Sequence, residues 1–151
     1  MPREYPEAPI VGVGAVIVKD NQVLLVRRGS APSRGMWSIP GGTVELGETL
    51  AQAAVREVRE ECQVEVEAGR VLSTLDLIQR DPKGRIRYHY VLVDLVARHV
   101  SGEPKAGTDA LEARWVKEAE FNQLDMVERL LPILCQALHC DGETPSRGYR
   151  A

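Results

Sequence analysis

The sequence predicts an α/β fold in which a mixed β-sheet packs against helices. Apolar runs with strand character lie both before and after one amphipathic helix, which is expected over 49–62. A second amphipathic helix is expected over 125–138. Because strands on either side of a central helix can join one sheet and bury a face of that helix, this order favours an α/β sandwich with a mixed sheet.

Turn and loop residues divide the chain into these elements. Residues 1–9 hold three prolines and are expected to form an extended N-terminal arm. The segment DPKG, at 81–84, is a clear turn between two longer strands. The five expected strands cover 10–18, 22–28, 64–78, 85–97 and 114–116. With the polar segment 141–151 as a flexible tail, residues 10–140 are expected to form a single domain.

Composition argues against several classes of protein. With 151 residues, the chain is long enough for one domain with a real core, and its net charge of −3 gives no positive footprint for a nucleic-acid polymer. No apolar run approaches the roughly 18 residues of a membrane span, and no signal peptide is evident. The three cysteines, Cys62, Cys135 and Cys140, lack metal-ligand spacing. Reduced thiols and a cytoplasmic location are therefore expected, with no membrane partner.

The helix over 49–62 carries many carboxylates. Glu57 and Glu61 are four residues apart and share a face, and Glu60 is three residues from Glu57. Like charges at these spacings destabilise a helix, and anions near its C-terminus oppose its dipole. A bound Mg²⁺ or Mn²⁺ would reverse these penalties, since hard cations take carboxylate oxygens. The alternative is a solvated acidic helix. The apolar stripe that anchors the helix is expected to be Ala51, Ala54, Val55, Val58 and Cys62.

Gly41 and Gly42, before this helix, are expected to form a glycine turn and complete a longer motif. Gly42, five residues, Glu48, seven residues and then REVREE (56–61) resemble the Nudix box, G-x5-E-x7-R-E-U-x-E-E-x-G-U, in which U is aliphatic. The preceding segment GMWSIPGG is similar to the usual lead-in of that family. Gln63 replaces the box glycine, whose position suits a left-handed helix terminator. A looser resemblance covers residues 8–138 and implies the Nudix α/β/α sandwich.

The Nudix resemblance also implies an activity and roles for the motif. The family hydrolyses a nucleoside diphosphate linked to another moiety, X, with Mg²⁺ or Mn²⁺ as the cofactor. Glu48 and Arg56 look like an ion pair that fixes the loop after Gly42 against the helix. Carried over position by position, the residues that look like metal ligands are Glu57, Glu60, Glu61 and, through its carbonyl, Gly41.

The general base remains open between a glutamate of the box and a carboxylate from a later loop, because the base varies within the family. Asp109 and Glu112 are the later candidates, and ordinary solvation of the loop is an equal alternative. If either is the base, the loop over 102–111 must close over the metal site, and its glycines and Pro104 suit a mobile lid. Asp109 is favoured because it lies nearer those glycines.

Substrate-binding candidates lie at the end of the second strand and after it. Arg27 and Arg28 have the chemistry to bind phosphates bidentately, and Trp37 to stack on a base. The alternatives are a solvated strand end and a core aromatic. The segment RDPKGRIRYHY (80–90) most resembles small bacterial Nudix members that are ADP-ribose pyrophosphatase-like.

A small nucleotide is therefore the expected partner, and a metal-dependent pyrophosphatase acting on ADP-ribose or a similar nucleoside diphosphate derivative is the expected function. Two alternatives stay open: a pyrophosphohydrolase of nucleoside triphosphates, and a non-catalytic module that senses a nucleotide. Sensor modules of this family generally lose box carboxylates, whereas here all three are present. A homodimer is compatible with the resemblance.

Overall fold

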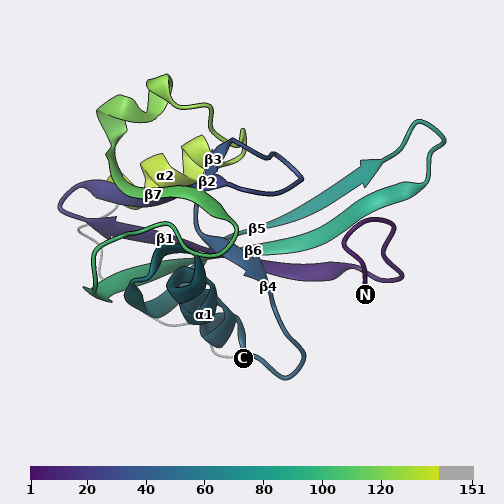
Figure 1. Cartoon of the computed structure of the whole chain (residues 1–151), viewed down its shortest axis with the longest axis horizontal. Helices are drawn as coiled ribbons and strands as arrows, with labels where there is room; N and C mark the ends of the chain where they lie inside the picture. Colours follow the sequence, from purple (N-terminus) through teal and green to yellow (C-terminus); the bar gives the residue numbers. More distant parts are fainter. Residues whose placement is uncertain (140–151) are drawn as a thin grey trace.

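The fold is a seven-stranded mixed sheet with helices on both sides, in a computed structural model that describes residues 1–139 (Figure 1). The strands are β1 (Ile10–Lys19), β2 (Gln22–Arg28), β3 (Trp37–Ser38), β4 (Gly41–Thr43), β5 (Glu65–Arg80), β6 (Ile86–Ser101) and β7 (Ala110–Lys117). The helices are α1 (Leu50–Cys62), the 3₁₀ helix η1 (Glu118–Gln123) and α2 (Leu130–His139). The expected tail at 141–151 and Cys140 lie outside the described residues. Within those residues, no helix is long and apolar enough to cross a membrane.

The strand order confirms the predicted mixed sheet. The order is β3-β2-β1-β6-β5, with β4 paired to β1 and β7 paired to β2. β1 and β6 run parallel, and their neighbours pair antiparallel. The β5–β6 hairpin is longer than predicted and extends well beyond the rest of the sheet (Figure 1).

Alternation along the central strands places α1 and α2 on opposite faces of the sheet. Val16 of β1 packs in one core cluster with Leu130 and Leu134 of α2. Its neighbour Ile17 packs in another cluster with Val58 of α1. Because successive side chains of a strand point to opposite faces, a strand buried on both faces reads as a continuous apolar run. This arrangement confirms the predicted α/β/α sandwich.

Side-chain caps fix both ends of α1. Thr49 and Gln52 form a capping box, in which the Thr49 Oγ1 accepts from the Gln52 N–H at 3.1 Å and the Gln52 Oε1 accepts from the Thr49 N–H at 2.9 Å. At the other end, Gln63 adopts a left-handed conformation with φ 58° and ψ 32°. The expected apolar stripe is wrong at one position, because Ala51 is exposed and Ala53 is fully buried instead.

Replacing Gln63 with Gly should stabilise the protein by about 1 kcal/mol, because a left-handed conformation costs roughly that much for a residue with a Cβ. The lost hydrogen bond from Gln63 Nε2 to the Ala106 carbonyl, 3.2 Å long and exposed, offsets part of this gain. Chemical denaturation measures the difference. The control is Gln63→Ala, which keeps the strain and loses the hydrogen bond and should therefore destabilise. A destabilised Gln63→Gly variant would show that the glutamine side chain matters more than the backbone strain.

Two predicted elements differ from the structure because backbone pairing replaces them. The expected glycine turn before the helix is a strand, β4, which pairs with β1 through Gly41↔Gly14 and Gly42↔Val13. The final helix begins at Leu130 and not at residue 125. The Trp37 N–H donates to the Asp125 carbonyl and the Trp37 carbonyl accepts from the Val127 N–H, at 2.8 and 2.9 Å, so this backbone serves a parallel bridge instead of a helix.

Candidate active site

The glycines of β4 make room for two carboxylates of α1. A Cβ on Gly42 would lie 2.5 Å from both carboxylate oxygens of Glu57, so only glycine permits this approach. A Cβ on Gly41 would overlap the Val13 carbonyl oxygen across the β1–β4 pair. The Gly41 N–H donates to Glu61 Oε2 at 3.2 Å. The glycine pair therefore brings the β4 backbone and the α1 carboxylates together.

Arg56 fastens the segment before α1 to the carboxylate cluster. Its Nε and Nη2 donate to the two Glu48 oxygens at 2.7 and 2.9 Å, and Nη2 also donates to the Thr43 carbonyl at 2.9 Å. Its Nη1 donates to Glu57 at 2.7 Å and to Glu60 at 3.3 Å. The ion pair that the family resemblance implies between Glu48 and Arg56 is thus present and bidentate. It forms because the chain folds back over the eight residues that separate them.

Glu48→Gln should reduce stability at neutral pH and have a much smaller effect in acid. The Arg56 hydrogen bonds lower the pKa of Glu48 to about 2. The stabilisation is therefore full above the unfolded-state pKa of about 4.5 and is lost as the pH falls from there toward 2. Thermal unfolding of both proteins across pH 2–7 measures this difference. Parallel curves with no convergence in acid would contradict the role of the pair.

Burial disfavours the charged form of two carboxylates in the cluster. The pKa of Glu61 is raised to about 8, chiefly by burial and also by the nearby charges of Glu57 and Asp109, although the Gly41 N–H and Arg28 oppose the shift. Burial also raises the pKa of Glu57, although Arg56 opposes this shift. Carboxylates whose charged form is disfavoured by burial and mutual repulsion are the electrostatic setting that a divalent cation relieves.

The loop before β7 brings Asp109 to this cluster. The N–H groups of Lys105, Gly107 and Thr108 donate to the carbonyls of Cys62, Glu61 and Glu60 at 2.9, 2.8 and 3.0 Å. These are carbonyls of the last turn of α1, which the helix itself leaves without partners. In this structure, the loop that was expected to act as a mobile lid is hydrogen-bonded to the end of α1. At Gly107 any Cβ would overlap the Glu60 carbonyl oxygen.

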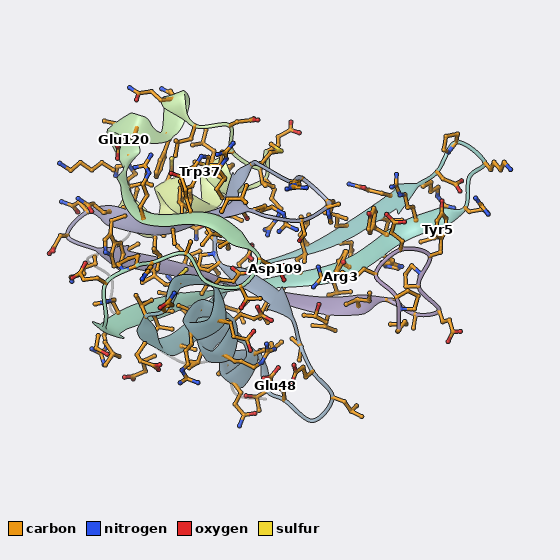
Figure 2. All side chains as sticks on the ribbon, viewed as in Figure 1. Arg3, Tyr5, Trp37, Glu48, Asp109 and Glu120 are labelled. Carbon is orange, nitrogen blue, oxygen red and sulfur yellow. The ribbon has the colours of Figure 1, made fainter. Side chains whose placement is uncertain are left out.

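These elements surround a pocket of about 380 Å³. It collects most of the residues that the sequence singled out: Gly41, Gly42, Arg56, Glu57, Glu60, Glu61, Asp109 and Arg28. Asp109 lies near the middle of the molecule, where α1, β4 and the loop before β7 meet (Figure 2). One side of the pocket is thus acidic and another carries an arginine, a charge distribution that suits a phosphate ester together with a cation.

Three predicted site residues lie away from the pocket lining. Trp37 is 7% exposed and packs in the core beneath Arg114, whose guanidinium lies 5.0 Å from the ring centroid, so the ring is not free to stack on a base. Arg27 and Glu112 face each other across β2 and β7, with Nη1 and Oε2 3.9 Å apart. Asp109 and Glu112 are the two loop candidates for the base, of which the sequence favoured Asp109. The structure separates them, because only Asp109 lines the pocket.

The sequence analysis missed two arginines of the pocket, Arg3 and Arg129. Arg129 Nη1 donates at 2.6 Å to Asp94, a carboxylate that is 1% exposed on β6. Asp94 stands alone inside the apolar run of that strand, and a buried charge needs a partner. The sequence pattern therefore indicated that a cationic side chain would pair with it. Arg3 gave no such signal, because a single arginine near the start of a chain is ordinary.

The pocket suits a hard divalent cation, because the carboxylates that line it offer the oxygen ligands that such ions prefer. Glu57 and Glu60 are turned toward Arg56, and among the described residues no three acidic, histidine or cysteine side chains already enclose a metal position. Binding of a cation by these carboxylates would therefore require their side chains to rearrange. The fold and this site define the class of the protein: an α/β/α sandwich whose candidate metal site draws most of its carboxylates from one helix.

Comparisons with known proteins identify the family. A sequence model of the NUDIX domain matches residues 8–137. The ADP-ribose pyrophosphatase of Methanocaldococcus jannaschii is 38% identical over 122 residues, which are 81% of this chain and 66% of that protein. The chain belongs to the Nudix hydrolase family. It spans slightly less than two thirds of the length of this archaeal relative and about half that of a putative ADP-ribose pyrophosphatase, YjhB, of Bacillus subtilis.

Solved structures share the fold. The MutT NUDIX hydrolase of Burkholderia pseudomallei superimposes with a TM-score of 0.73 at 32% identity, covering 86% of this chain and 98% of that one. The NUDIX domain of Shewanella oneidensis NrtR, crystallised with ADP ribose, gives a TM-score of 0.68 at 26% identity, covering 87% of this chain and 88% of that one. These matches confirm the predicted Nudix fold.

Proposed function

We propose that this chain is a divalent-metal-dependent pyrophosphatase that cleaves the diphosphate linkage of ADP-ribose or a similar nucleoside diphosphate derivative, by attack of water at phosphorus. The observation that carries the proposal is the pocket in which Glu57, Glu61 and Asp109 face a common space that Arg28 also lines. The carboxylates supply cation ligands and a base, and the arginine supplies a donor for phosphate oxygens.

Glu57, Glu60, Glu61 and the Gly41 carbonyl are the proposed ligands of Mg²⁺, for which Mn²⁺ can substitute. When bound, the ion neutralises phosphate oxygens and lowers the pKa of water. Arg56 holds Glu57 and Glu60 side by side, so that repulsion does not drive them apart before the substrate arrives. The capping contacts of Gly107 and Thr108 hold the neighbouring Asp109 next to the pocket.

Asp109 is the proposed general base. Its carboxylate accepts the proton of the attacking water, and its charge is within electrostatic reach of Glu61, which places it beside the proposed metal ligands. Glu61, with its raised pKa, is the competing candidate in the absence of a metal. Glu61 would be a ligand of a bound cation, and its carboxylate would then be a weaker base, which favours Asp109 as the group that takes the proton.

The choice of ADP-ribose rests on the relatives, because an ADP-ribose pyrophosphatase and a NUDIX domain crystallised with ADP ribose are both among them. The three carboxylates of the box favour turnover over sensing, since a module that only binds does not need them. A triphosphate pyrophosphohydrolase would use the same carboxylates and stays the second candidate.

A panel of substrates tests the proposal. Purified protein with Mg²⁺ is offered ADP-ribose and each nucleoside triphosphate, and the products are separated by chromatography. We expect AMP and ribose 5-phosphate from ADP-ribose, with kcat/KM at least tenfold above that for any triphosphate. Preferred release of pyrophosphate from a triphosphate would support the second candidate. Tight binding of ADP-ribose without turnover would indicate a sensor and overturn the proposal.

A further inference from the structure

The N-terminal arm, residues 1–9, is hydrogen-bonded to the β5–β6 hairpin near its turn. Glu4 accepts hydrogen bonds from the Tyr88 hydroxyl at 2.7 Å and from Arg87 Nη2 at 3.1 Å. The Tyr5 hydroxyl donates to Asp81 Oδ2 at 3.0 Å, and the Tyr5 N–H donates to the Arg87 carbonyl at 2.8 Å. Two consecutive residues, Glu4 and Tyr5, thus fix the arm to the hairpin through side chain and backbone.

This attachment places Arg3, the residue just before the fastened pair, in the lining of the active-site pocket. Figure 2 shows Arg3 between Tyr5, at the hairpin, and Asp109, near the centre of the molecule. The arm therefore adds a cation to the pocket from a segment that contributes no strand to the sheet.

Arg3 differs from the other arginines of the pocket in its partners. Arg56 is paired with Glu48, and Arg129 is paired with the buried Asp94. Across residues 1–139, by contrast, no carboxylate lies within the 4.0 Å of a salt bridge to the Arg3 guanidinium, and the same holds for Arg28. The positive charge of Arg3 also contributes to lowering the pKa of Arg28, after the larger effect of burial. Two unpaired cations facing one pocket repel each other, and an anion between them removes that penalty.

We propose that Arg3 binds a phosphate group of the substrate together with Arg28, and that Glu4 and Tyr5 are positioning residues that deliver it. The inference deepens the proposed function, because the ligand it requires is the diphosphate of a nucleoside diphosphate derivative. A guanidinium donates two parallel hydrogen bonds to phosphate oxygens. The ionised carboxylates on α1 cannot donate hydrogen bonds, so the donors for a bound phosphate must come from other residues of the pocket.

A purely structural arm would also explain the Glu4 and Tyr5 contacts, but it would give Arg3 no role. The test therefore compares Arg3→Ala, Arg3→Lys and a matched control, Arg70→Ala, in which the arginine lies on β5 away from the pocket lining. KM and kcat are measured on ADP-ribose, and binding of inorganic pyrophosphate with Mg²⁺ is measured by calorimetry. Thermal unfolding reports on structure.

For Arg3→Ala we expect KM to rise about tenfold and pyrophosphate affinity to fall about tenfold, the loss of one charge-assisted hydrogen bond, with kcat within threefold. Arg3→Lys should recover part of both, and Arg70→Ala should match the parent protein. Melting temperatures should change little, because the Arg3 side chain makes no hydrogen bond or salt bridge within residues 1–139. If KM and pyrophosphate affinity of Arg3→Ala both stay within twofold, the arm is only a structural clasp and the inference is overturned.

A double-mutant cycle separates positioning from direct binding. Tyr5→Ala should raise KM in the parent protein and have no further effect in the Arg3→Ala background. An equal effect in both backgrounds would overturn the positioning role of Tyr5. If the parent protein hydrolyses no nucleoside diphosphate derivative but loses pyrophosphate affinity in Arg3→Ala, the proposed function fails while the phosphate site at Arg3 stands.

Discussion

Glu61→Gln is expected to lower kcat at least 100-fold with Mg²⁺ while the protein stays folded. Glu61 is the most buried carboxylate of the cluster and already accepts the Gly41 N–H, so an amide at this position fits the space but is a poor ligand for a hard cation. Several kcal/mol of transition-state stabilisation are expected from metal ligation, and each 1.4 kcal/mol is tenfold in rate. Steady-state kinetics on ADP-ribose measures the loss.

The same substitution should stabilise the metal-free protein at pH 8. The folded-state pKa of Glu61, about 8, lies above its unfolded value near 4.5, so the folded protein holds a proton that the unfolded chain has released. Stability without metal therefore falls as the pH rises from about 4.5 to 8, and Glu61→Gln removes this dependence. Thermal unfolding in EDTA at pH 6 and pH 8 checks the sign.

Glu57→Gln should lose activity in the same way, and Glu103→Gln, an exposed carboxylate in the loop before β7, serves as the control. Full Mg²⁺-dependent turnover in Glu61→Gln would contradict its assignment as a ligand. A metal-free stability that rises between pH 6 and pH 8 in the parent protein would contradict the electrostatic description of the site.

Asp109→Asn should lower kcat about 100-fold with little change in KM, because a general base acts mainly in the transition state. Asp109 lines the pocket beside Glu61, whereas Glu112 lies on β7 and faces Arg27. Glu112→Gln should accordingly keep kcat within threefold. The two substitutions are matched controls for each other, since each removes one carboxylate from the same segment.

The pH–rate profile decides whether Asp109 is the base. In the parent protein, an acidic limb should report the protonation of the base, and this limb should move or disappear in Asp109→Asn. An unchanged acidic limb in both single variants and in the double variant would exclude the segment and return the role to a glutamate of α1.

The sequence predicted α1 to within one residue because its signals are local. A threonine cap, an apolar stripe and a glutamate cluster all act over one or two helical turns. Helical periodicity alone would leave Arg56 facing solvent, opposite the apolar stripe, but its side chain is only 21% exposed because the segment with Glu48 folds back onto it. That contact depends on the path of the preceding segment, which helical periodicity does not describe.

Contacts between backbone groups could not be predicted from the sequence either, because they also depend on the path of segments that are distant in the chain. The 102–109 loop contacts the end of α1 through backbone N–H groups and carbonyls. Because nearly every residue carries these groups, no pattern of side chains in the sequence predicts the contact. The pairing of β4 with β1 and the bridge at Trp37 belong to the same kind. Asp109 was favoured because of its nearby glycines, and the structure places it in the pocket lining. The loop that carries Asp109 is held there by hydrogen bonds to the last carbonyls of α1.

The dependence of turnover on a divalent cation tests the central claim most directly. Protein treated with EDTA and then dialysed is assayed on ADP-ribose without metal, with added Mg²⁺ and with added Mn²⁺, in parallel with Glu61→Gln. The account predicts that turnover disappears without metal, returns with either cation in the parent protein, and returns with neither in Glu61→Gln. Undiminished hydrolysis by the metal-free protein would contradict it.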